Sequence, residues 1–177
     1  MTIQTGLLSK DFNHILQKET IAPMNIIFDL SSVFFDTHIN PSCATQRTLA
    51  CGLTPINPSM SMRLLFDCAR NGNKLFLLSD ITSEHFDFLS SNPQAKMIFN
   101  YFDEIIFTNS LNSMNDNSYL FNRIIDKYSL TPHQSIFINN QIVNARAAEQ
   151  AGISKNILCS NFDFISIRKE LKHHGAL

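Results

Sequence analysis

The chain has 177 residues, of which 44% are hydrophobic and only 16% charged, and its formal net charge is -1. This length suits one domain, and a chain of this size buries about 70% of the surface that its unfolded form exposes, so it needs no disulfide or metal to hold it together. The sequence has no Lys/Arg-rich block, which argues against binding to nucleic acid or to an anionic membrane surface.

The cysteines show no Cys-x-x-Cys pair and no metal-type spacing with histidine, so the sequence predicts no metal site of that kind. Cys68 and Cys159 stand among apolar residues and are predicted to be buried thiols, whereas a disulfide between Cys43 and Cys51 stays open. The first residues lack a signal-peptide pattern, and no run of about 18 apolar residues is present. These patterns predict a cytoplasmic protein without a transmembrane helix, with export by a route that uses no cleaved signal left open.

The first part of the chain contains a predicted helix and a long irregular stretch. Residues 8–19 show helical spacing, and Pro23 separates them from the first strand. We therefore expect an N-terminal helical extension at residues 1–22 and a single domain at residues 23–177. The chain after the first strand is rich in proline and predicts an irregular segment, with a short cap or lid loop at about residues 37–58.

Strands and helices alternate along the predicted domain. Short apolar runs bounded by polar residues predict buried strands at about residues 25–30, 74–79, 104–108, 135–139 and 156–159. Apolar residues at helical spacing predict helices at about residues 59–70, 83–90, 93–101, 118–128, 141–151 and 162–172. Such alternation implies parallel pairing with right-handed crossovers. The predicted fold is a three-layer α/β/α, Rossmann-like sandwich with a central, mainly parallel sheet and a minimal cap.

Polar residues stand at or near the carboxyl ends of the predicted strands, where open α/β sheets place their chemistry. They are Asp29 and Ser31, Ser79 and Asp80, the loop around Asn115, and Asn139 with Asn140. We expect these strand ends to line one crevice. Because side chains alternate along a strand, Asp80 is predicted to face away from it.

The order and apolar context of these residues resemble the haloacid dehalogenase (HAD) superfamily over about residues 25–160. The family's first motif, Asp-x-Asp-Gly-Val, stands here as Asp29-Leu-Ser-Ser-Val33. Its later motifs are a strand ending in Ser or Thr, a Lys before the fourth strand, and paired acids, which fall on Ser79, Asn115, and Asn139 with Asn140. The resemblance implies a HAD-like fold with degenerate motifs.

In the family's phosphatases the first Asp attacks phosphorus, and a Ser helps to hold the phosphoryl oxygens. The resemblance therefore assigns Asp29 to the nucleophile position and Ser79 to the phosphate-binding position. The second Asp of the family protonates the leaving group and activates water. Ser31 stands in its place, and a serine hydroxyl does not act as a general acid near neutral pH.

The remaining motif positions have lost their charges. Asn115 replaces the Lys that neutralises the nucleophile and the phosphate in the family. Asn139 and Asn140 replace the paired acids that bind magnesium, and Mg²⁺ prefers carboxylate ligands. The family's magnesium has therefore lost most of its ligands here, and we expect no cofactor and no metal.

The sequence thus predicts a HAD-like protein that lacks Mg-dependent phosphatase activity and acts as a pseudoenzyme or as a binding or regulatory module. The alternative is a HAD-like hydrolase, phosphatase or other, with altered chemistry, which uses Asp29 as nucleophile with helpers such as His38. A further alternative is a surface for an unknown protein partner on the predicted lid. Neither substrate nor partner is specified by the sequence.

Overall fold

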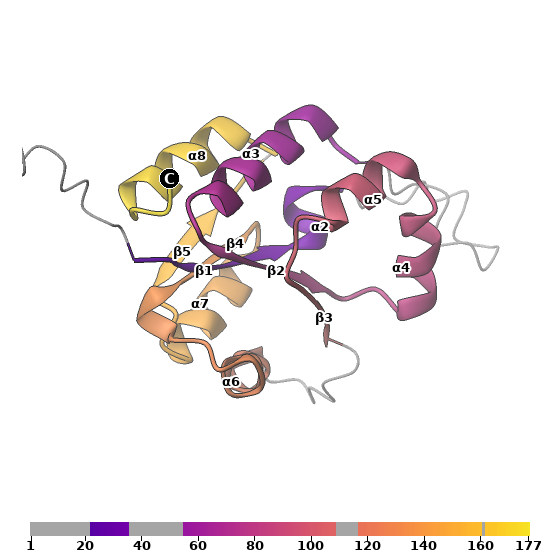
Figure 1. The fold of residues 1–177 in the computed structure, drawn as a ribbon. Coiled ribbons are helices and arrows are strands. Elements are labelled where there is room, and N and C mark those ends of the chain that lie inside the picture. Colours follow the sequence, from indigo (N-terminus) through magenta and orange to yellow (C-terminus); the bar gives the residue numbers. More distant parts are fainter. Residues whose placement is uncertain (1–21, 36–54, 109–116, 161) are drawn as a thin grey trace, which may run out of the picture.

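The fold is built around a five-stranded sheet. The computed structural model describes residues 22–35, 55–108, 117–160 and 162–177 (Figure 1). The strands are β1 (Asn25–Asp29), β2 (Lys74–Ser79), β3 (Glu104–Phe107), β4 (Ser135–Asn139) and β5 (Lys155–Leu158). They pair in parallel in the order β3-β2-β1-β4-β5, so β1 occupies the centre. All five strands were predicted from their apolar runs, to within one residue at most ends.

The helices lie close to their predicted positions, with one exception. They are α2 (Leu30–Val33), α3 (Pro58–Arg70), α4 (Ser83–Ser90), α5 (Pro93–Phe99), α6 (Asn117–Tyr128), α7 (Ile142–Gln150) and α8 (Phe164–His173), with a 3-10 turn at Pro132–Gln134. The exception is α2, because the chain directly after β1 was predicted to be irregular. The predicted helix at residues 8–19, most of the predicted lid, His38, Cys43 and Cys51 lie outside the described residues.

Helices cover both faces of the sheet, which confirms the predicted three-layer sandwich. In Figure 1, α3 and α8 lie over one face and α6 and α7 over the other. Alternation along β1 explains this, because Ile26 and Phe28 join the core with α3, α5 and α8, whereas Ile27 joins the core with α6 and α7. All three side chains are fully buried. Both faces of β1 are therefore covered, as its continuous apolar run predicted.

The short helix α2 turns the chain at the carboxyl end of β1. Asp29 ends the strand in extended conformation and directly precedes the helix. The Phe34 backbone N–H donates to the Leu30 carbonyl at 3.2 Å, and the Phe34 carbonyl accepts from the Ile56 N–H at 2.8 Å. Phe34 and Leu30 are both buried. Tertiary packing therefore fixes the turn that follows Asp29.

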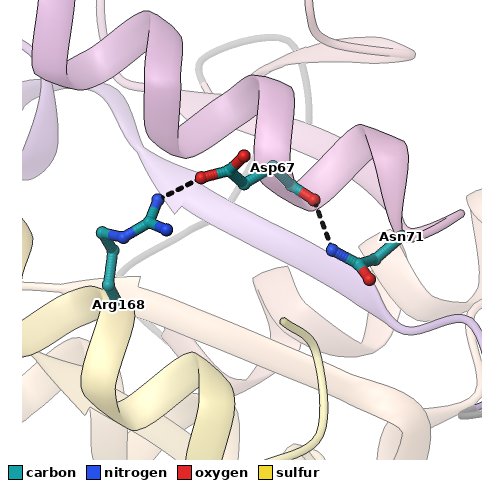
Figure 2. A network of polar contacts seen from close by, with 3 residues as sticks. All are labelled: Asp67, Asn71 and Arg168. Carbon is teal, nitrogen blue, oxygen red and sulfur yellow. Dashed lines mark hydrogen bonds and ion pairs between the residues drawn. The ribbon is translucent and has the colours of Figure 1, made fainter.

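An ion pair links α3 to α8, as Figure 2 shows. The Arg168 Nη1 atom lies 2.5 Å from Asp67 Oδ2, and Asn71 Nδ2 donates to the Asp67 backbone carbonyl at 2.7 Å. The Asp67 and Arg168 side chains are about a quarter exposed, at 24% and 27%. The solvent therefore screens their attraction in part.

Replacing Arg168 by methionine is expected to lower the free energy of unfolding by about 0.5–1 kcal/mol, because partly exposed ion pairs contribute little. The loss should shrink as salt is added, since salt screens such charges. Urea unfolding followed by circular dichroism measures it. The matched control is Lys169→Met in the same helix, at an exposed position. Equal losses in the two variants would contradict a stabilising pair.

No helix among the described residues combines the length and the apolar character that crossing a bilayer requires.

Candidate functional site

A pocket of about 180 Å³ lies at the carboxyl edge of the sheet. Its walls come from the end of β1 and from α2, from the end of β2 and the residue after it, from the residues after β3 and β4, and from the first part of α6 and of α7. The lining residues are Asp29, Ser31, Leu78, Asp80, Thr108, Leu120, Phe121, Gln141 and Asn144. This is the edge at which the sequence placed the candidate site.

Asp29 and Ser31 both line this pocket. The Asp29 side chain ends the central strand and is only 9% exposed. The Ser31 hydroxyl, on α2, donates to Asp29 Oδ1 at 3.3 Å. The structure therefore brings together the residues that the resemblance assigned to the nucleophile and general-acid positions.

The end of β2 differs from the prediction. Asp80 is exposed and lines the pocket, so the prediction that it faces away is wrong. The reason is that β2 ends at Ser79, and the alternation of a strand does not continue into the turn that follows it. Ser79 is buried, its hydroxyl oxygen accepts a hydrogen bond from the Ile81 N–H at 3.3 Å, and it is not among the lining residues. The phosphate-binding role of Ser79 stays a prediction.

Asn139 is the last residue of β4 and Asn140 follows it, and neither is among the residues that line the pocket. Asn139 is fully buried, and its Oδ1 accepts from the Gln141 N–H at 2.8 Å, which shapes the turn into α7. Asn140 is exposed. The predicted position Asn115 lies outside the described residues.

Four polar residues at the pocket were not singled out by sequence reasoning in this role: Asp80, Thr108, Gln141 and Asn144. Asp80, Thr108 and Gln141 stand one or two residues after β2, β3 and β4, whereas Asn144 lies within α7. Polar residues directly after each strand end, whatever the alternation of the strand, could therefore have indicated the first three.

The charge of the described pocket lining is negative. Asp29 and Asp80 are carboxylates, and the lining includes no lysine, arginine or histidine. Burial raises the pKa of the Cys159 thiol to about 11, and the negative charge of Asp29 contributes to this shift. Burial raises the pKa of the Cys68 thiol to about 12. Both thiols are buried, as predicted, and both are protonated at neutral pH.

The family's magnesium does not fit the residues present. Asn139 supplies no carboxylate, and its side-chain oxygen is engaged by the Gln141 N–H. Within the described part of the chain, no group of three or more His, Cys, Asp or Glu residues could hold a metal ion. We therefore derive no chemical step through a metal.

No family model and no curated protein matches the sequence. Solved structures do match the fold. A hydrolase from Streptococcus pneumoniae TIGR4 is 15% identical with a TM-score of 0.61, over 85% of this chain and 98% of that chain. An L-2-haloacid dehalogenase from Xanthobacter autotrophicus is 13% identical with a TM-score of 0.61, over 85% of this chain and 83% of that chain.

A third structure is a HAD family enzyme from Bacteroides thetaiotaomicron, an aspartate-to-alanine mutant in complex with magnesium and inorganic phosphate. It is 13% identical with a TM-score of 0.62, over 78% of this chain and 94% of that chain. The chain has the HAD-like fold. Identities this low establish the fold alone.

Proposed function

We propose that this HAD-like protein lacks Mg-dependent phosphatase activity and acts as a pseudoenzyme or as a binding or regulatory module. The observation that carries the proposal is the set of side chains around Asp29 in the pocket. Ser31, at the general-acid position, donates to Asp29 Oδ1. A serine hydroxyl does not supply a proton near neutral pH, and a missing general acid typically costs about 10²–10⁴-fold in rate.

Among the described residues, the lining of the pocket also includes no cationic side chain, whereas phosphoryl transfer requires positive charge. The sequence at residues 109–116, Asn115 included, contains no Lys, Arg or His. Removing one group that stabilises a transition-state charge costs about 3–4 kcal/mol, and several such losses do not add. These features argue against turnover of phosphate.

A second candidate function is a hydrolase with altered chemistry, and the position of Asp80 favours it. Asp29 and Asp80 line one pocket, so Asp29 could act as nucleophile while Asp80 transfers the proton that Ser31 does not. This arrangement would not need the family's paired acids. Asp29 would still have to attack its substrate in a pocket with two carboxylates, which repel an anionic substrate such as a phosphate ester.

Hydrolysis of p-nitrophenyl phosphate and p-nitrophenyl acetate separates the two functions. We expect the wild-type chain, with or without Mg²⁺, to show no release of p-nitrophenol beyond that of the Asp29→Asn variant. The physical reason is the loss of the general acid and of the positive charge. Asp87→Asn, at an exposed position outside the pocket, is the matched control.

Turnover that disappears in Asp29→Asn and persists in Asp87→Asn would overturn the proposal. Turnover that also disappears in Asp80→Asn would identify the second candidate as the function of the pocket.

A further inference from the structure

We propose that the buried amide of Asn139 turns the position that holds magnesium in the family into a site for one water molecule beside Asp29. The amide donates to the water oxygen, and the water donates to the Asp29 carboxylate. This inference rests on the proposed function in one respect, because both leave no magnesium beside Asp29. Three observations carry it, which are the fixed orientation of the amide, its unsatisfied donor and the closeness of Asp29 in the sheet.

The Asn139 side chain has only one acceptable orientation of its amide. The side chain is fully buried, and its Oδ1 accepts from the Gln141 backbone N–H at 2.8 Å. A backbone N–H is a donor only, so rotating the amide by half a turn would set two donors against each other. The Nδ2 group is therefore held away from the Gln141 N–H, and its own N–H donors need an acceptor elsewhere.

The Nδ2 donor of Asn139 has no acceptor among the described residues. The atom is buried, and it makes no hydrogen bond within the described part of the chain. Asn73 shows the contrast, because its buried Nδ2 donates to the Cys68 and Ala176 carbonyls. An unsatisfied buried donor is costly, so buried polar groups are paired with protein groups or with ordered water. The donor of Asn139 therefore requires an acceptor that is not one of the described groups.

Asn139 and Asp29 end neighbouring strands on the same face of the sheet. Ile27 pairs with Phe137 in the register of β1 and β4, and both belong to the core with α6 and α7. Asp29 and Asn139 stand two residues further along each strand, so the alternation of side chains puts them on that same face. Because adjacent strands are about 4.8 Å apart, the amide lies next to the carboxylate that lines the pocket.

A water molecule suits both neighbours, whereas a divalent cation suits only the carboxylate. Water accepts from an N–H, donates to a carboxylate and is small enough for a buried position. Asp29 accepts from Ser31 and takes part in further interactions, but a carboxylate offers about four acceptor sites, so it need not be free. A cation accepts no hydrogen bond, and the N–H groups turn their positive ends towards it. The amide that needs water therefore repels Mg²⁺.

Nuclear magnetic resonance of the ¹⁵N-labelled full chain detects the water directly. We expect the Asn139 side-chain amide protons to show cross-peaks with water whose NOE and ROE have opposite signs, which distinguishes bound water from hydrogen exchange. The matched control is the Asn73 side-chain amide, which is also buried but has its donors paired with carbonyls, and it should show no such cross-peak. A spectrum without the cross-peak at Asn139 would overturn the inference.

The variant Asn139→Asp tests whether the amide excludes the cation. Aspartate keeps an oxygen for the Gln141 N–H and places a second one where Nδ2 stood. Two close carboxylates repel each other, so the variant should melt below the wild type without metal, and about 10 mM Mg²⁺ should raise its melting temperature by about 2–4 °C. The wild type should not respond. Asn100→Asp, which adds the same charge at an exposed position outside the pocket lining, should not respond either.

A rise in the wild type, or no rise in a folded Asn139→Asp, would contradict exclusion by the amide. If Asn139→Asp does not fold, the cross-peak at Asn139 decides alone. The inference and the proposed function fail in different ways. Asp29-dependent hydrolysis of p-nitrophenyl phosphate with Mg²⁺ would refute the proposed function. A chain that is inactive with Mg²⁺ but lacks the cross-peak at Asn139 would refute only the water site.

Discussion

Replacing Phe34 by alanine is expected to lower the free energy of unfolding by about 3–5 kcal/mol. The Phe34 ring is fully buried, with its centroid 5.3 Å from that of Phe28 and 5.7 Å from that of Phe102. The rings of Phe28 and Phe102 lie 5.9 Å apart, so the three form one cluster. Removing the Phe34 ring loses its buried apolar surface. It also leaves a cavity, because the neighbouring residues of the close-packed core relax only in part.

The cluster also fixes the backbone beside the pocket. Phe34 caps α2, which carries Ser31, and its carbonyl accepts the hydrogen bond from Ile56. Loss of the ring should therefore loosen the turn after Asp29 as well as lower the global stability. Faster hydrogen exchange at the Phe34 and Ile56 amides than at β2 amides would report this local effect.

Guanidinium unfolding followed by far-ultraviolet circular dichroism measures the loss, because the chain has no tryptophan to report by fluorescence. The matched control is Phe88→Ala, which removes the same atoms from a ring that is 57% exposed. It should change the stability by less than about 0.5 kcal/mol. If Phe34→Ala does not fold, Phe34→Leu, which keeps most of the volume, should lose less than about 1.5 kcal/mol. Equal losses for Phe34→Ala and Phe88→Ala would contradict the packing described.

The same region shows where prediction from sequence succeeds and fails. The run Ile26, Ile27 and Phe28 indicated a strand buried on both faces, and β1 is the central strand. Such runs are informative because burial on both faces leaves no polar position. The helix α2 was missed because its four residues, two of them serine, carry no helical pattern. It forms because Leu30 and Phe34 pack into the core, which only the folded structure shows.

The sequence predicted where the pocket lies, but it predicted only some of the residues that line it. Asp29 was placed correctly because a strand's end is fixed by its apolar run. Asp80 was misplaced because the side-chain direction after a strand depends on the turn, which the residue types do not encode. The same holds for Thr108, one residue beyond β3, which faces the pocket without any motif to mark it.

Asn73 is the second position at which a large effect is expected, because three segments meet at its buried side chain. Its Oδ1 accepts from the Met24 N–H at 2.9 Å, before β1. Its Nδ2 donates to the Cys68 carbonyl at 2.9 Å, on α3, and to the Ala176 carbonyl at 2.7 Å, beyond α8. Nothing in the sequence indicated this role, since partners so distant in the chain leave no local signal.

Replacing Asn73 by alanine is expected to lower the free energy of unfolding by about 2–4 kcal/mol, because the Met24 N–H and the Ala176 carbonyl lose their hydrogen bonds to this buried side chain. Asn71→Ala is the matched control, since that exposed side chain makes a single bond to the Asp67 carbonyl and should cost less than about 0.5 kcal/mol. Urea unfolding of both variants measures the difference. Similar losses would contradict the assigned contacts of Asn73.

The variant Asn73→Asp tests whether the three buried hydrogen bonds of Asn73 matter or whether Asn73 is an ordinary turn residue. Aspartate keeps the oxygen that accepts from Met24, but it places a second acceptor against the Cys68 and Ala176 carbonyls. An unpaired carboxylate in this buried position is costly, so Asn73→Asp should destabilise at least as much as Asn73→Ala. A turn residue would tolerate aspartate, because asparagine and aspartate serve equally well in turns. A near-neutral Asn73→Asp would therefore mean that Asn73 is only a turn residue after α3, and a large loss of stability would mean that it links β1, α3 and the segment after α8.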